Sequence, residues 1–102
     1  MRKGATPIIE CTLPSNFDIK LVAKAKLTIE YKEGEVLEKY ASAQECEGRT
    51  FRFSLTQEET FLFDGNSNIK MQLRVLTKEG ETLSSNVRTV FVEECLDNEV
   101  LE

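Results

Sequence analysis

The sequence contains no histidine and no tryptophan, and only three cysteines and two prolines in 102 residues. Without histidine, the chain cannot form a histidine-dependent catalytic triad or bind a metal through imidazole. It also lacks a P-loop and the GxGxxG and GxSxG motifs. Acidic pairs such as Glu58-Glu59 and Glu93-Glu94 are adjacent rather than converging, as solvated carboxylates commonly are. The sequence therefore predicts no catalytic, cofactor-binding or metal-binding residues, and a protein that is not an enzyme.

The three cysteines, Cys11, Cys46 and Cys95, are far apart in sequence, and no CxxC motif is present. A zinc site or a disulfide scaffold is not expected at this number and spacing. Small, apolar, reduced thiols fit best, although a Cys11–Cys95 or Cys11–Cys46 bridge remains open. The stretch Asp64-Gly65-Asn66-Ser67-Asn68 lacks the alternating acids and the distal glutamate of a calcium loop, which favours a plain turn.

No apolar run approaches the ~20 residues that a membrane-spanning helix needs. Arg2 and Lys3 are not followed by an apolar segment, so no secretory signal is expected. Thirteen Lys and Arg against eighteen Asp and Glu give a net charge of −5. This balance argues against a nucleic-acid or anionic-membrane partner. Four lysines that lie close together in the sequence are interpreted as part of the solvent-exposed face of one strand: Lys20, Lys24, Lys26 and Lys32.

The length and the 40% hydrophobic content are typical of one domain with one core. We predict a flexible arm at residues 1–6, a single domain at 7–96 and an acidic tail at 97–102. Strands are expected at 8–13, 24–32, 36–43, 50–55, 68–76 and 83–93. The segment 17–21 is either a loop or the start of the next strand.

The clearest strand is 24–32, where Ala25, Leu27, Ile29 and Tyr31 alternate with polar residues. Period-two alternation means that one face of the strand is buried and the other is wet. In 83–93, Val87, Thr89 and Phe91 share a face with Leu83, whereas Val90 and Val92 lie on the other. This pattern predicts one long strand that is covered on both faces near its end.

One short helical turn is predicted at Thr56–Phe61. Thr56 and Glu59 have the spacing of a capping box, in which each side chain satisfies the other residue's free backbone N–H. Such a turn can carry the chain from one sheet to a second sheet. The strand before it presents Phe51, Phe53 and Leu55 on one side.

A Lys-Glu-Gly sequence occurs at 32–34 and again at 78–80, each time between apolar alternations. Both copies predict a three-residue hairpin loop in which the glycine adopts a positive φ. This register pairs Ile29 with Leu37 and Val75 with Leu83. The repeat of this sequence is explained either by independent use of the same favourable turn or by a true internal duplication. Independent use is favoured because the sequences flanking the two copies diverge.

The segment from Thr50 to Val92 combines several features that lie in a fixed order: Leu-Thr-Gln-Glu-Glu-Thr at 55–60, Asp64-Gly65, Gln72-Leu73-Arg74 within 69–77, Gly80, Leu83-Ser84-Ser85-Asn86 and a final strand at 90–92. With them it resembles small β-rich proteins of phage and prophage structural-gene regions in Gram-positive, often gut, bacteria. The N-terminal half is similar only in pattern. Where those proteins tend to end in an Asp-Gly-Val-Ile-like stop, this chain has Asp97-Asn98-Glu99-Val100. The resemblance implies a role in the virion or its assembly and no particular site residue.

We therefore predict an all-β, immunoglobulin-like antiparallel β-sandwich of about seven strands, with a small closed barrel as the alternative. The expected function is that of a non-enzymatic phage structural or assembly protein in the bacterial host cytoplasm, and in the virion if it stays in the particle. Its expected partners are other phage structural proteins or further copies of itself, with no nucleic acid, membrane or small-molecule substrate. The alternative function is a binding module for a host-surface glycan or protein. The lack of tryptophan and an inward Tyr31 argue against a sugar platform.

Overall fold

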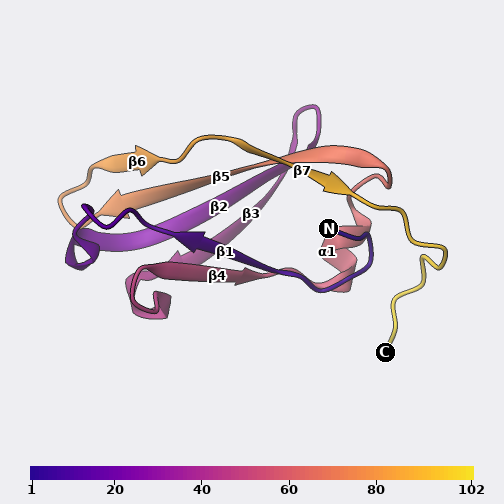
Figure 1. The fold of residues 1–102 in the computed structure, drawn as a ribbon, viewed down its shortest axis with the longest axis horizontal. Coiled ribbons are helices and arrows are strands. Elements are labelled where there is room, and N and C mark those ends of the chain that lie inside the picture. Colours follow the sequence, from indigo (N-terminus) through magenta and orange to yellow (C-terminus); the bar gives the residue numbers. More distant parts are fainter.

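The computed structural model describes residues 1–102 and shows an all-β chain with one short α-helix (Figure 1). All strand pairs are antiparallel. The elements are β1 (Ile8–Thr12), β2 (Val22–Lys32), β3 (Glu35–Ser42), β4 (Thr50–Ser54), α1 (Gln57–Phe61), β5 (Ser67–Thr77), β6 (Thr82–Ser84) and β7 (Arg88–Val92), with 3₁₀ turns at Ile19–Leu21 and Ala43–Glu45. None of the helices has the length and hydropathy needed to cross a bilayer.

The strands form two sheets. The larger sheet has five strands in the order β3-β2-β5, with β6 and β7 sharing the far edge of β5. The smaller sheet contains only β1 and β4. Seven strands in two antiparallel sheets confirm the all-β prediction, and the sheets do not close into a barrel because β1 pairs with β4 alone.

Both sheets contribute to one core. In β2 and β5, alternate residues are buried, as the period-two pattern predicts. Phe51 and Phe53 of β4 meet them from the smaller sheet, and Tyr31 packs against Phe63 with ring centroids 5.7 Å apart. Phe17 and Ile19 lie in a loop and a 3₁₀ turn and contact the core, which decides between the two interpretations of 17–21.

The predicted helical turn is confirmed as α1, and it connects the two sheets, since β4 and β5 belong to different ones. The Thr56 hydroxyl accepts from the Glu59 backbone N–H at 3.1 Å, and the Glu59 carboxylate accepts from the Thr56 N–H at 2.8 Å. This reciprocal pair is the predicted capping box. Thr60, fully buried behind it, donates to the Ala5 carbonyl and accepts from the Gly4 N–H.

Both predicted hairpins are present in the predicted register. Ile29 pairs with Leu37, and Val75 pairs with Leu83. The glycines at the turns have positive φ values, +78° at Gly34 and +89° at Gly80. The predicted three-residue loop is present only in the second hairpin, where the Thr77 N–H donates to the Glu81 carbonyl around residues 78–80. In the first hairpin Lys32 pairs with Glu35 after a register shift, so the loop contains only two residues.

The prediction of one long strand at 83–93 is wrong. The chain forms β6 and β7 instead, separated by Ser85-Asn86-Val87. The Ser85 hydroxyl accepts a hydrogen bond from the Leu73 N–H at 3.0 Å. In a regular sheet this N–H would donate to a backbone carbonyl of the neighbouring strand. Beyond this break, the register moves by one residue, because Ile69 faces Val90 rather than Thr89.

That one-residue shift also corrects the prediction that both faces of this segment are covered. Val92 is fully buried, whereas Phe91 on the opposite face is 50% exposed. Val87 and Leu83 are also exposed. A register change by one residue reverses which side chains face the core.

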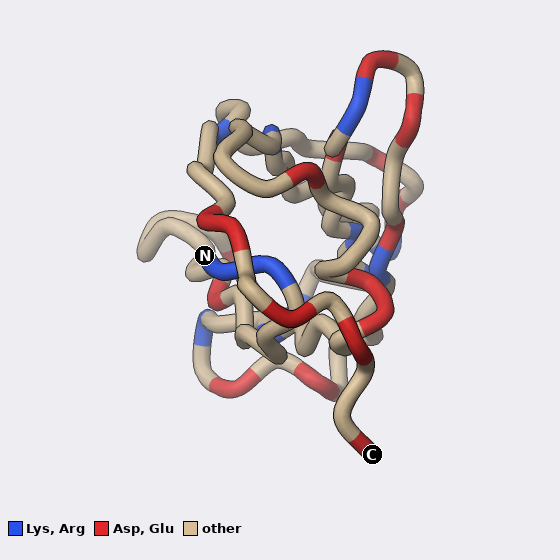
Figure 2. Tube along the Cα trace, turned by 90° about the vertical axis from the view of Figure 1, so that its right-hand side faces the viewer, with Lys and Arg blue, Asp and Glu red and all other residues tan.

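The N-terminal residues lie beside the segment that follows β7. Lys3 N–H donates to the Glu93 carbonyl, and Glu93 N–H donates to the Met1 carbonyl. The segment 93–102, here called the C-terminal tail, continues past α1, where the Gln57 side chain makes two 2.9 Å hydrogen bonds with the Leu101 backbone. Figure 2 shows acidic residues along this tail to the C-terminus.

Candidate interaction surface

The outward side of the five-stranded sheet, here called the outer face, is covered by no other element. Its side chains come from alternate positions of β2, β3 and β5, and all are exposed or half-exposed. The residues are Lys24, Lys26, Thr28, Glu30, Val36, Glu38, Tyr40, Lys70, Gln72, Arg74 and Leu76. A sheet side of this size, with polar, aromatic and apolar groups mixed, suits contact with another macromolecule.

A cross-strand row of Tyr40, Lys26 and Arg74 crosses the outer face, because Lys26 pairs with Tyr40 on one side and Arg74 on the other. The Lys26 ammonium lies 5.7 Å from the centre of the Tyr40 ring, within the range of a cation–π contact. Together with Lys24, which lies two residues before Lys26 on the same face of β2, these residues form what we call the basic cluster. Residues of this cluster line a shallow hollow of about 250 Å³.

Glu38 of β3 contacts two members of the basic cluster, Lys26 and Tyr40. The Lys26 ammonium is 3.1 Å from one of its oxygens, and the Tyr40 hydroxyl donates to the other at 2.9 Å. These hydrogen bonds, from Lys26 first and Tyr40 second, lower the pKa of Glu38 below its ordinary value. The Tyr40 ring is thereby oriented while remaining 59% exposed.

The charge of the outer face is opposite to that of the whole chain. Four cations and two carboxylates give it a net +2, whereas the chain carries −5, so the rest of the molecule carries −7. Lys24, Lys70 and Arg74 have no ion-pair partner within 4 Å. Their charges are therefore available to an external group.

A second hollow, the side groove, lies between β1 and the Ser85–Arg88 segment and has a volume of about 370 Å³. Leu27, Met71 and Leu73 line it from the larger sheet, and Ile9 and Cys11 from β1. Burial raises the pKa of the Cys11 thiol, an effect that the nearby Arg88 charge partly opposes. A thiol with a raised pKa is a weak nucleophile at neutral pH.

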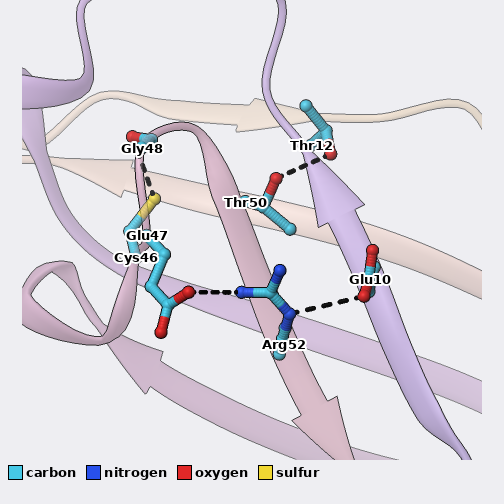
Figure 3. A network of polar contacts seen from close by, with 7 residues as sticks. All are labelled: Glu10, Thr12, Cys46, Glu47, Gly48, Thr50 and Arg52. Atoms are coloured by element: carbon cyan, nitrogen blue, oxygen red, sulfur yellow. Dashed lines mark hydrogen bonds and ion pairs between the residues drawn. The ribbon is translucent and has the colours of Figure 1, made fainter.

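The solvent side of the smaller sheet carries a polar network rather than a hollow (Figure 3). Arg52 of β4 pairs with Glu10 of β1 at 3.3 Å and with Glu47 of the preceding loop at 2.8 Å. The hydroxyls of Thr12 and Thr50 lie 2.9 Å apart. These groups satisfy one another within the chain, so this side offers less unpaired charge than the outer face.

The structure separates the predicted lysine run. Lys24 and Lys26 lie on the outer face, Lys20 lies in a 3₁₀ turn, and Lys32 lies 3.9 Å from Asp64. Sequence reasoning missed that β5 brings Arg74 beside Lys26. Only the β2–β5 register reveals this pair, since the residues are 48 positions apart.

The remaining sequence candidates do not converge on a site. All three cysteines are free, so neither of the two bridges left open is formed. No group of three or more Cys, Asp or Glu side chains is arranged to hold a metal ion. The 64–68 stretch forms a turn leading into β5, with Asn66 at φ +55°.

A comparison with protein-family models found no matching family, and comparisons with curated proteins and with solved structures found no similar chain.

Proposed function

We propose that this protein is a non-enzymatic structural or assembly module that works through protein–protein contacts. The observation that carries the proposal is the outer face, a sheet surface that no part of the chain covers. Its exposed Tyr40 and unpaired Arg74 are residue types that are enriched at protein interfaces.

Two unpaired sheet edges support the same proposal. β1 bonds to β4 on one side only, and β3 bonds to β2 on one side only. Free strand edges present backbone N–H and C=O groups that a strand of another protein can pair with. We also infer that the two sheets form an immunoglobulin-like sandwich, since both contribute to one core and the chain crosses between them at α1.

The biological setting of the proposal comes from the resemblance of residues 50–92 to phage and prophage structural-region proteins. We propose a role in particle assembly within the bacterial host cytoplasm. The partners would be other structural proteins of the particle or further copies of this chain.

The test is direct binding between the purified protein and the purified products of the genes adjacent to its own, with the protein itself included as a ligand. We expect at least one of these to bind with a Kd of about 10 μM or tighter, in the range of specific protein complexes. Arg74→Glu should weaken that binding at least about tenfold, because it reverses a charge of the basic cluster on the outer face. Lys78→Glu, the same charge reversal at an exposed turn residue away from the outer face, is the matched control. Absence of binding to every candidate, or equal binding by both variants, would contradict the proposal.

One observation favours the alternative, a binding module for a host-surface glycan. Tyr40 is 59% exposed and its hydroxyl is held by Glu38, so an oriented aromatic ring faces solvent. Sugars stack on such rings and hydrogen-bond to flanking polar groups. A glycan array would detect this activity, and Tyr40→Ala should abolish any signal that arises from the outer face.

A further inference from the structure

We propose that the basic cluster binds the acidic C-terminal tail of a second copy of this chain, giving head-to-tail association. This inference rests on the proposed function and names one partner for the outer face. It depends on the charge, the apolar content and the position of the basic cluster and the tail.

The tail has the complementary charge. Residues 93–102 contain five carboxylate side chains and no lysine or arginine. Asp97, Glu99 and Glu102 are exposed and have no ion-pair partner in the chain. The basic cluster offers Lys24 and Arg74, which are also unpaired. Contact between the two would therefore pair charges that are otherwise left in solvent.

The tail also has apolar side chains that its own molecule leaves largely uncovered. Leu96 is fully exposed and Leu101 is 74% exposed. The outer face provides the Tyr40 ring and Leu76 beside the cations. Apolar contact surrounded by charge pairs is the usual composition of a specific interface.

Position favours a second copy over the tail's own outer face. The basic cluster lies where β2 begins and β5 ends, and both of these strand ends lie at the left of Figure 1. The tail lies at the opposite end, beyond α1, where Leu101 is hydrogen-bonded to Gln57. The molecule is 45 Å long, and the basic cluster and the tail lie toward opposite ends of its long axis. Surfaces at opposite ends generate a heterologous contact that can propagate from copy to copy.

The experiment uses two variants that each lose one surface. Lys24→Thr/Arg74→Thr removes the cations of the basic cluster while keeping strand-compatible residues. Asp97→Asn/Glu99→Gln/Glu102→Gln removes three of the five side-chain charges of the tail and leaves the Arg2–Glu93 ion pair intact. A third protein, Lys20→Thr/Lys78→Thr, removes two exposed cations outside the outer face as a charge control. Circular dichroism and thermal unfolding check that each variant folds.

Light scattering on a sizing column is then measured at two protein concentrations and at ionic strengths of about 0.05 and 0.5 M. For the unmodified chain and the charge control, we expect the mass to rise with concentration at low salt, and the association to weaken at least about tenfold at high salt. Each surface variant alone should stay at the 11.6 kDa monomer mass. An equal mixture of the two should form a complex of about twice that mass and grow no further, because only one functional contact remains per pair.

A monomeric unmodified protein under all four conditions would overturn the inference, as would a mixture that does not associate. Loss of association in the charge control would also overturn it, because net charge rather than the basic cluster would then be responsible. Binding of a single-stranded oligothymidylate without self-association would assign the outer face to another class of partner. If self-association fails but an adjacent gene product still binds, the inference is wrong and the proposed function stands.

Discussion

The two Lys-Glu-Gly hairpins have equivalent pairs near the turn and differ in how far they extend. In the β2–β3 hairpin, pairing continues from the turn to Lys24 and Ser42. In the β5–β6 hairpin, it covers only three residue pairs. Leu37 of the first hairpin is half-buried against the core, whereas Leu83, at the equivalent position of the second, is 45% exposed.

The difference arises at one equivalent pair of residues beyond the turn. Lys39 pairs with Leu27 in the first hairpin, and its ammonium reaches Glu59 of α1 at 3.0 Å. Ser85 occupies the equivalent position of the second hairpin and uses its hydroxyl to accept from the Leu73 N–H. A turn therefore sets the register of a hairpin, but contacts with the rest of the chain decide how far the hairpin extends.

The largest expected loss of stability comes from removing a core side chain that the smaller sheet supplies. Phe53 of β4 is buried at 3% exposure, so Phe53→Ala should cost about 3–5 kcal/mol of unfolding free energy. Phe91→Ala, the same change at a half-exposed position on β7, should cost less than about 1.5 kcal/mol. Urea unfolding measures both. A cost below about 1 kcal/mol for Phe53→Ala would show that this face of β4 does not carry the core.

The next test asks whether the two turn glycines are equivalent. Gly34 and Gly80 both have positive φ, and a Cβ at either would meet no atom within 4 Å. Gly34→Val and Gly80→Val should therefore each cost about 2 kcal/mol, through backbone conformation alone. Thermal unfolding of the two variants gives the comparison. Unchanged stability for Gly80→Val would contradict the positive-φ requirement, and very different values would mean that the two glycines are not equivalent.

A smaller effect separates the arms of the hairpins. Leu37→Ala should cost about 1.5 kcal/mol because the side chain is half-buried against the core. Leu83→Ala should cost under about 1 kcal/mol because its side chain is mostly in solvent. Equal costs would imply that Leu83 is covered in solution, and self-association should then be measured on both variants.

Sequence patterns predicted the parts of this fold that local chemistry decides. Alternation identified the buried face of 24–32, and the Thr56–Glu59 spacing identified the capping box. The break at Ser85 could not be predicted because a serine in a strand does not reveal which backbone N–H its hydroxyl will accept from. The basic cluster was missed for a related reason, since Lys26 and Arg74 meet only through long-range strand register.

The smallest predicted effect concerns the ion pair that distinguishes the longer hairpin. Burial alone would raise the pKa of Glu59, but hydrogen bonds from the Thr56 backbone and the Lys39 ammonium outweigh it, so its pKa lies below the ordinary 4.5. A carboxylate with a lowered folded-state pKa stabilises the fold above about pH 4.5, and this contribution is lost as the pH falls through the folded-state value. Glutamine can still accept the Thr56 N–H bond, so Glu59→Gln removes the charge while preserving the cap.

We therefore expect Glu59→Gln to lower the unfolding free energy by about 1 kcal/mol or less at pH 7, because the pair is partly exposed to solvent. The difference from the unmodified protein should shrink as the pH falls below about 4.5, because the Glu59 carboxyl becomes protonated as the pH passes through its folded-state pKa. Urea unfolding at pH 7 and at pH 3 measures the difference, with Glu58→Gln, an exposed acid in the same turn, as the control. A difference that is unchanged or larger at pH 3 would mean that the Lys39–Glu59 pair does not stabilise the longer hairpin, and that its extension depends on apolar contacts alone.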